Sequence, residues 1–505
     1  MEKKKRKFSF PTAFTVLFIV LILASALTYI IPAGSYSKLS YNASSSMFEV
    51  TSPSGEVKEM PATQETLDKL KIVNEISKFT DGDINKPIAI PGTYEKVEQQ
   101  PQGIVDIILS PVNGVYDTID IILFVFIIGG IIGVLNNIGA FNAGIASLSR
   151  ITKGREYLLI VFITFLIALG GTTFGLAEET IALYPILVPV FLAANYDVLV
   201  CIAAIYMGSS IGTMFSTVNP FSAVIGSNAA GISFTNGLYF RVAALIIGTL
   251  ITVVYILKYA KKVKEDPTKS IVYEDKEQIE KKFASQGEAP PLTLRFKIIL
   301  LLFLVTFIVM IYGVSNPNLG WWFPEMTGLF LVSAILIGFL SGLGEKEFVN
   351  QFLTGASELI SVALVIGVAR SINLVLENGL ISDTILEFFS RSIAGMNPNI
   401  FIVLMLLVFI VLGFFIPSSS GLAVLSIPIM APLADAVGLP RDVIISAYLY
   451  GIGLIAFITP TGLILATLSM VDITYDKWLK FIMPLMGYIA IFSAIMLLIQ
   501  VNLKI

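Results

Sequence analysis

Residues 171–189, GTTFGLAEETIALYPILVP, place two adjacent acids, Glu178 and Glu179, in a run of glycine, threonine and aliphatic residues. In a water-soluble protein such acids are typical of an exposed helix start. The composition indicates a different solvent, because 55% of the 505 residues are hydrophobic and the mean hydropathy is +0.84. Only 14% are charged, against about 25% in soluble domains. The chain is therefore predicted to be an all-α polytopic membrane protein.

Several windows approach the roughly 18 to 20 apolar residues that a spanning helix needs. They are residues 13–31, 119–135, 238–257, 298–314, 329–343 and 481–501. The first lacks a small-residue cleavage pattern, so we expect a retained anchor. The single cysteine, Cys201, excludes a disulfide framework and a multi-cysteine metal site. The chain has no histidine, so carboxylates would have to carry any coupled proton. We expect no cofactor, no metal and no nucleic-acid partner.

Basic clusters near the ends of the apolar windows indicate the cytoplasmic side. They divide the chain into a cytoplasmic basic N-terminus (1–10), a first membrane half (11–258), a cytoplasmic linker (259–297) and a second membrane half (298–505). The polar segment 33–102 follows an in-to-out helix and is placed outside the membrane. Its sequence is compatible with a small folded cap or with a partly disordered loop.

The two halves repeat a pattern. Pro185 and Pro189 lie as far after the acids as Pro428 and Pro432 lie after the end of FFIPSSSG (414–421). Each proline pair is followed by an apolar run that glycine and proline interrupt, GSSIGTMFSTVNPF (208–221) in the first half and GIGLIAFITPTG (451–462) in the second. Two interrupted hydrophobic segments in corresponding positions point to the binding site of a secondary transporter.

Residues 156–193 are too long for one buried helix and polar in the middle, which predicts a re-entrant hairpin that enters from the cytoplasm and turns at the acids. Residues 400–436 predict a second hairpin that enters from outside. The spans then number about nine, with two hairpins, arranged as an inverted repeat in which each half also carries a broken transmembrane helix.

A carboxylate in the membrane costs about 2.5 kcal/mol or more, so the two acids are candidate ligands of a substrate or coupling ion. Adjacent helical residues point about 100° apart, so we expect one acid to face the pocket and the other to satisfy backbone donors or pair with a base. The sequence leaves open which does which. The other turn is rich in hydroxyls at a helix start, which favours an anion.

Polar residues in the broken spans offer similar groups. Arg370 is either a counter-ion to a carboxylate or the mark of a span end near Glu377. The candidate substrate-binding residues are Glu178, Glu179, Thr180, Thr217, Asn219, Arg370, Ser418, Ser419, Ser420, Gly421, Thr459, Thr461 and Gly462. No catalytic residue is predicted.

An acidic turn facing a turn suited to a carboxylate fits a substrate that is cationic at one end and carries an amino-acid carboxylate at the other, which is a basic amino acid. A dicarboxylate would be repelled by the acids unless a sodium ion or proton intervened. A channel would need rings of charges or carbonyls from several subunits, and an enzyme would need a nucleophile beside a base, for which the sequence offers no constellation.

Three stretches, FGLAEETIALYPILVP (174–189), FFIPSSSGLAVLSIPIMAPLAD (414–435) and ITPTGLILATLSMVDITYDKWLKF (458–481), resemble the YfcC-like branch of the anaerobic C4-dicarboxylate carrier (DcuC) family, within the ion transporter superfamily. The resemblance covers nearly the whole chain. It implies an inverted-repeat fold with two hairpins, a homodimer, and an elevator-type displacement in the cytoplasmic membrane of a bacterium.

Similar proteins of this branch exchange arginine for ornithine, whereas the name of the wider family records dicarboxylates. The superfamily builds sodium sites from Ser-Asn-Thr motifs in its hairpins, and the turns AEET and SSSG lack that asparagine, which speaks against sodium coupling. The sequence therefore predicts an arginine/ornithine antiporter embedded in a lipid bilayer. The alternative is an ion-coupled carrier of C4-dicarboxylates or other carboxylates.

Overall fold

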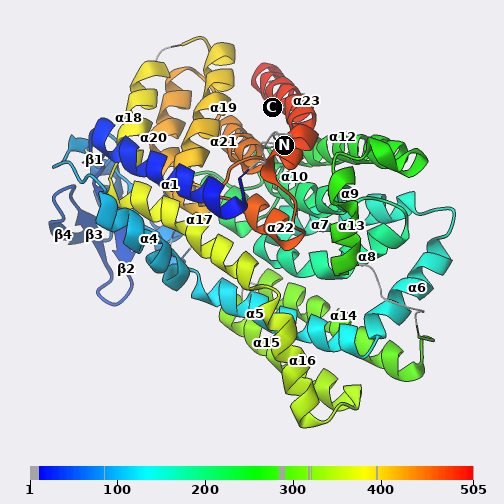
Figure 1. The fold of residues 1–505 in the computed structure, drawn as a ribbon. Helices are drawn as coiled ribbons and strands as arrows, with labels where there is room; N and C mark the ends of the chain where they lie inside the picture. Colours follow the sequence, from blue (N-terminus) through cyan, green and yellow to red (C-terminus); the bar gives the residue numbers. More distant parts are fainter. Residues whose placement is uncertain are drawn as a thin grey trace, which may run out of the picture.

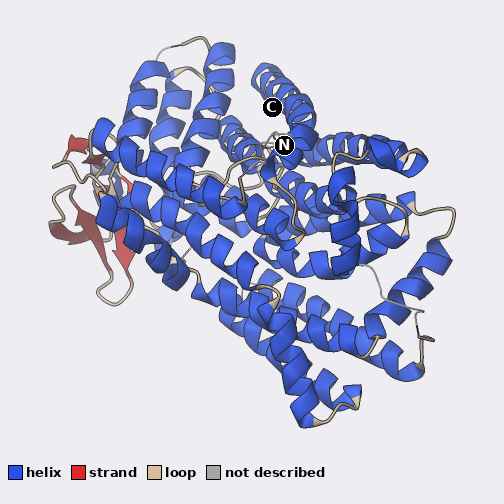
Figure 2. Cartoon of the chain, in the orientation of Figure 1, coloured by secondary structure: helices blue, strands red, loops and turns tan. Residues whose placement is uncertain are grey.

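The computed structural model describes residues 11–82, 84, 86–283, 290–316, 319, 321–393 and 396–503. A large helical part carries a small β-domain at one end (Figures 1 and 2). Ten of its helices are long and apolar enough to cross a membrane, and each of the six predicted windows overlaps one of them, with 13–31 and 329–343 running slightly past the helix end. The prediction of an all-α polytopic membrane part is confirmed. The basic N-terminal cluster lies outside the described residues.

The same order of elements occurs twice along the chain. The first set comprises α1 (Ala13–Ile30), α4 (Ile104–Asp117), α5 (Ile119–Asn137), α6 (Ala140–Thr152), α7 (Tyr157–Phe174), η1 (Glu178–Leu183), α8 (Tyr184–Ala193), α9 (Val198–Ile202), η2 (Ala203–Met207), α10 (Gly208–Met214), η3 (Pro220–Val224), α11 (Ile225–Ala229) and α12 (Leu238–Glu265). The second comprises α15 (Phe323–Ser341), α16 (Glu345–Ser357), α17 (Ile360–Asn378), α18 (Ser382–Ile393), α19 (Pro398–Phe415), α20 (Ser419–Ala436), α21 (Arg441–Ala456), α22 (Ile464–Met470) and α23 (Tyr475–Leu503).

In each set a bent helix (α4–α5, α16–α17) precedes a short helix (α6, α18), two helices joined by a tight turn (α7–α8, α19–α20), an interrupted helix (α9–α11, α21–α22) and a long last helix (α12, α23). Between the sets lie η4 (Pro267–Lys269), η5 (Tyr273–Asp275), α13 (Lys276–Phe283) and α14 (Leu294–Ser315), which has no counterpart. The pairs α7–α8 and α19–α20 are hereafter the first and second hairpins. The opposite orientation of the two halves stays a prediction.

The bent helices cross one another where glycines remove side chains. A Cβ on Gly355 of α16 would lie 2.3 Å from the carbonyl oxygen of Gly129 and 2.7 Å from the Cα of Gly133, both on α5. The contact between α4 and α17 is equally close, since a Cβ on Gly114 would lie 2.1 Å from the carbonyl oxygen of Gly367. Small residues let membrane helices approach backbone to backbone, so these two crossings fix α4, α5, α16 and α17 as one unit, hereafter the scaffold, on which α1 and α15 pack.

Apolar side chains on α1 and α14 point away from the protein. Examples are Ile22, Leu23, Leu301, Leu304 and Ile308, each at least 45% exposed. A lipid bilayer is the solvent in which such faces are stable, so the chain is a multi-pass membrane protein.

The segment between α1 and α4 is folded. Of the two alternatives that the sequence left open, a small folded cap and a partly disordered loop, the structure has the folded cap. Its strands are β1 (Gly34–Ser35), β2 (Lys38–Asn42), β3 (Met47–Thr51), β4 (Val57–Pro61), β5 (Ile88–Ala89) and β6 (Glu95–Lys96), with two short helices, α2 (Gln64–Lys69) and α3 (Ser77–Thr80). β4, β3, β2 and β5 form one antiparallel sheet, and β1 pairs with β6. Leu39, Phe48, Leu67 and Ile88 are fully buried beneath them. We call residues 33–102 the outer domain.

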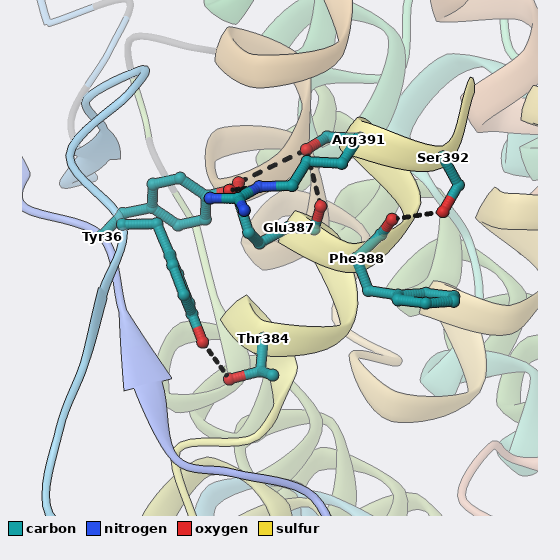
Figure 3. Close-up of polar contacts among 8 residues, drawn as sticks. Tyr36, Thr384, Glu387, Phe388, Arg391 and Ser392 are labelled. Atoms are coloured by element: carbon teal, nitrogen blue, oxygen red, sulfur yellow. Dashed lines mark hydrogen bonds and ion pairs between the residues drawn. The ribbon is translucent and has the colours of Figure 1, made fainter. Parts of the chain in front are cut away.

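The outer domain is docked on α18 by polar contacts (Figure 3). Tyr36 donates its hydroxyl hydrogen bond to Glu387 Oε2 at 2.6 Å, and Glu387 also pairs with Arg391 at 2.5 Å. The hydroxyls of Tyr94 and Thr384 lie 2.8 Å apart. Burial is the main cause that raises the pKa of Tyr36, and the hydrogen bond to Glu387 adds to it. Tyr36 therefore stays protonated and serves as a donor.

Asp383, at the start of α18, accepts two hydrogen bonds from the outer domain on one oxygen. Ser35 Oγ lies 3.2 Å and Tyr36 N lies 3.1 Å from Asp383 Oδ2. Burial raises the pKa of Asp383, against the lowering effects of these donors and of the nearby Lys38 charge. Burial thus makes the ionised carboxylate less favourable at this contact than it is in water.

The close crossing of α5 and α16 predicts the effect of one added methyl group. Gly355→Ala should destabilise the protein by about 1–3 kcal/mol, because backbone atoms on both sides cannot move away independently. Gly328→Ala on α15 is the matched control, since a Cβ there meets nothing within 4 Å. Thermal unfolding of the purified protein in detergent measures both. Equal unfolding temperatures for the two variants would contradict the close crossing.

The buried Asp383 carboxylate predicts a pH effect. Because its folded pKa is raised above the unfolded value of about 3.9, its stabilising contribution is full below that value and is lost as the pH rises through the folded pKa. Asp383→Asn keeps one oxygen for both donors and removes the charge, so it should unfold at an equal or higher temperature than the wild type at pH 7.5 and lose the pH dependence. Asp383→Ala should be less stable by about 1–3 kcal/mol at any pH. A destabilised Asp383→Asn at pH 7.5 would show that the charge is needed.

Candidate functional site

The turn of the first hairpin begins at a left-handed glycine. α7 ends at Gly175, whose φ is 79°, a conformation that favours glycine. A Cβ on Gly175 would also lie 2.9 Å from Asn219 Nδ2. Only glycine therefore permits this turn to rest directly on residues 215–219, where the first interrupted helix is broken.

Two predicted site residues hold the break against the hairpin. Thr217 donates its backbone N–H to Thr172 Oγ1 at 2.9 Å, and Asn219 Nδ2 donates to the carbonyl oxygen of Gly171 at 3.2 Å. Asn219 Oδ1 accepts from the N–H of Phe221 at 2.8 Å. Both ends of the Asn219 amide are thus used by the backbone, and we assign Thr217 and Asn219 a positioning role.

The two acids of the turn have different partners. Glu179 Oε2 accepts a hydrogen bond from the N–H of Ala177 at 3.1 Å, and Thr180 Oγ1 donates to the carbonyl oxygen of Ala177 at 2.6 Å. Glu179 and Thr180 therefore close the turn on itself. Across the described part of the chain, no other residue donates a hydrogen bond to Glu178, and its charge interacts with that of Asp120. Glu178 is the acid whose carboxylate is left for a ligand.

Asp120 is a residue that the sequence reasoning missed. It lies in the first turn of α5, at the break between α4 and α5. The available signal was a pair of acids, Asp117 and Asp120, interrupting an apolar run. Asp120 brings a second carboxylate to the first turn from the scaffold, so this end of the site is acidic from both sides.

The second turn meets the same broken segment. Ser419 Oγ donates to the carbonyl oxygen of Phe221 at 3.1 Å, and Tyr448 donates its hydroxyl to the carbonyl oxygen of Ser419 at 2.7 Å. Ser418 Oγ caps α20 by accepting from the N–H of Gly421 at 3.1 Å. Ser420 Oγ accepts from Lys86 Nζ of the outer domain at 2.6 Å. The hydroxyl turn and the acidic turn are therefore brought together on residues 215–221.

Buried hydroxyls flank this meeting point. Ser216 is 0% and Ser222 is 3% exposed, and neither hydroxyl has a hydrogen-bond partner among the described residues. Buried polar groups in proteins are nearly always paired, with protein, water or a ligand. These two hydroxyls are what a polar ligand between the turns would satisfy.

The second broken segment is tied elsewhere. Thr459 Oγ1 and Thr461 Oγ1 lie 2.8 Å apart, and Gly462 donates its N–H to the carbonyl oxygen of Thr459 at 3.1 Å. Two carbonyl oxygens just before this segment are also paired. The carbonyl oxygen of Ala456 accepts a hydrogen bond from the Tyr206 hydroxyl at 2.7 Å, and that of Phe457 accepts one from Trp478 Nε1 at 2.9 Å. Within the described residues no hydrogen bond joins residues 459–462 to either turn.

Arg370 is neutralised within the scaffold. Its guanidinium pairs with Asp117 of α4 and with Glu377, which lies on the same face of α17 about two turns further on, the latter at 3.1 Å. Of the two readings of Arg370, the structure supports the counter-ion to carboxylates. Arg370 does not mark the end of a span, because it lies in the middle of α17. With two acids beside it, Arg370 fixes α17 to α4.

A cavity of about 250 Å³ opens beside the first hairpin, away from the turns. It lies between α5, α6, α8, α13 and the α16–α17 break, and Pro185 and Pro189 of α8 form part of its wall. Its polar lining consists of Asn136, Asn142, Lys281, Lys282 and Glu358. Lys282 bridges to Asp472 at 2.7 Å. The cavity therefore offers both signs of charge beside the linker helix α13.

The partners of the two acids predict different mutational effects. Glu179→Ala removes the acceptor that the N–H of Ala177 uses and should destabilise the protein by about 1–3 kcal/mol. Glu179→Gln keeps an acceptor oxygen and should unfold near the wild-type temperature. Glu178→Gln should leave stability unchanged and lower ligand affinity. Thermal unfolding with and without ligand separates the cases, and a stability loss confined to the Glu178 variant would reverse the assignment.

Comparison with known proteins identifies the family. A family model described as "C4-dicarboxylate anaerobic carrier" (DcuC) matches residues 10–502. An uncharacterised protein of Haemophilus influenzae is 51% identical over 505 residues, covering 99% of both chains. A protein of Escherichia coli K12 named "Putative basic amino acid antiporter YfcC" is 29% identical over 521 residues, covering 98% of this chain and 97% of its own.

Solved structures are similar only distantly. The Alcanivorax borkumensis YdaH transporter is 12% identical with a TM-score of 0.40, and covers 98% of this chain and 99% of its own. The Neisseria gonorrhoeae efflux pump MtrF is 16% identical with a TM-score of 0.39, and the match covers 97% of this chain and 95% of the MtrF chain. The family match and its full coverage carry the conclusion: the chain belongs to the DcuC family of membrane transporters.

Proposed function

We propose that this transporter exchanges basic amino acids across the cell membrane, with arginine taken in for ornithine. The observation that carries the proposal is the meeting of an acidic turn and a hydroxyl turn on residues 215–221. The acidic side has Glu178 and Asp120, and the hydroxyl side has Ser419 and the start of α20. A guanidinium or ammonium suits the first and a carboxylate suits the second.

The acids also give a reason for exchange. An empty site with uncompensated carboxylates is costly to move through a low-dielectric membrane, whereas the same site neutralised by a cationic amino acid is cheaper. Arginine and ornithine carry the same charge, so either can neutralise the site on its return. Binding near the membrane midplane with alternating access then gives one-for-one exchange without an external energy source.

The cavity beside the first hairpin supports a route from the cytoplasm. It borders α8, which leads back to the acidic turn, and its lining includes the Glu358 carboxylate, for which the described residues provide no ion-pair partner, together with two amides. A zwitterion with a cationic side chain finds groups of both signs there. Displacement of the hairpins against the scaffold would open the corresponding route on the other face, in keeping with the elevator-type prediction.

The second candidate is an ion-coupled carrier of C4-dicarboxylates. The description of the matched family and the lysine beside Ser420 favour it. It requires a proton or cation on Glu178 when the substrate binds, since two negative charges would otherwise meet Glu178 and Asp120. The two candidates therefore differ in what neutralises Glu178, which is the cationic substrate itself in the first and a proton or coupled cation in the second.

Exchange in liposomes tests the proposal. Labelled arginine should enter vesicles preloaded with ornithine and should not enter vesicles preloaded with buffer. Glu178→Gln should lower arginine uptake about 10- to 100-fold at subsaturating concentration, since a charge-assisted hydrogen bond contributes about 1.5–3 kcal/mol. Glu345→Gln, at the exposed start of α16, is the matched control. Entry of labelled succinate, with no entry of arginine under either loading, would support the second candidate instead.

A further inference from the structure

The outer domain is fastened to the scaffold side at its base. Gln99 Nε2 donates to the carbonyl oxygens of Thr28 and Ile31 at 2.6 and 2.8 Å, and the N–H of Gln102 donates to Thr28 Oγ1 at 2.9 Å. These contacts bind the linker between β6 and α4 to the end of α1, which packs on α17. The base of the outer domain therefore stays with α1.

The opposite side of the outer domain lies on the second hairpin and on the first interrupted helix. β5 packs along α20 of the second hairpin. Asn74, which is 1% exposed, donates through Nδ2 to the carbonyl oxygen of Asn228 near the end of α11 at 2.5 Å. Lys86 reaches Ser420 at the second turn. The outer domain thus touches α20 and α11, which pack on each other.

These contacts differ in strength. The Asn74 bond is buried, so breaking it without replacement leaves a desolvated amide. Lys86 is exposed, and an ammonium beside a helix N-terminus has the disfavoured sign. The Lys86 contact is therefore weak, and it persists because the outer domain is held in place by the Asn74 bond and by the α18 contacts shown in Figure 3.

We propose that the outer domain is a releasable lock on the outer face of the transporter. It binds the scaffold through α1, the second hairpin through β5 and Lys86, and α11 through Asn74, so the hairpin cannot move against the scaffold until the contacts with α20 and α11 open. The proposal rests on the proposed function in one respect, that transport requires this movement. Lys86 covers the second turn in the locked state, and access to Ser420 from outside requires its departure.

Covalent closure tests the lock. The only cysteine, Cys201, is fully buried, so Lys86→Cys with Ser420→Cys can be joined selectively by a short bifunctional thiol reagent. Joining should lower exchange at least tenfold, and a reducing agent that cleaves the reagent should restore it. Glu49→Cys with Glu59→Cys, opposite each other on β3 and β4, is the matched control that links the domain only to itself. Unchanged exchange in the joined 86–420 protein would overturn the lock.

A second measurement needs no transport. A membrane-impermeant thiol reagent applied from outside should modify Ser420→Cys about tenfold faster when Asn74→Ala is added, because the outer domain is then released more often. Lys58→Ala, on the exposed β4 strand, should leave the rate unchanged. Equal rates with and without Asn74→Ala would overturn the lock, whereas a wild type that exchanges no basic amino acid would overturn the proposed function alone.

Discussion

Residues 215–221 are the segment on which the rest of the site depends. In a membrane an interrupted helix leaves backbone donors and acceptors that lipid cannot satisfy. Here the first turn supplies partners through Thr172 and Gly171, and the second turn bonds the carbonyl oxygen of Phe221 through Ser419. The phenyl ring of Phe221 also packs on Trp322, with ring centroids 5.3 Å apart. Hydrogen bonds between the interrupted helix and the two hairpins thus bring the two turns together. The candidate ligand-binding groups lie on these turns and are therefore brought together as well.

Much of the membrane part could be predicted from the sequence. The apolar windows located spanning helices, and the acids at 178–179 and serines at 418–420 marked the two turns because polar residues inside apolar runs have few structural uses. Which acid faces a ligand could not be predicted. The choice depends on Glu179 bonding the N–H of Ala177, a contact set by turn geometry rather than by residue type. Asp120 was missed because its relevance appears only when α5 packs beside the first hairpin.

The outer domain was the least predictable part. Its strands are two to five residues long, too short for a clear period-two pattern, and its contacts with the hairpin are long-range. Asn74 and Asn228 are 154 positions apart, and Lys86 and Ser420 are 334 apart. Polar side chains in a polar segment carry no signal of such pairing. The same contacts join a small folded domain to the hairpin that carries the hydroxyl turn.

The central claim is that Glu178 and the second turn hold opposite ends of one substrate. An experimental structure of the protein in lipid nanodiscs with saturating arginine tests this most directly. Density for one arginine should lie between the turns, with the guanidinium at Glu178 and the carboxylate toward Ser419 and the start of α20. Density for arginine elsewhere, or a site beside residues 215–221 filled by a dicarboxylate and not by arginine, would contradict the account.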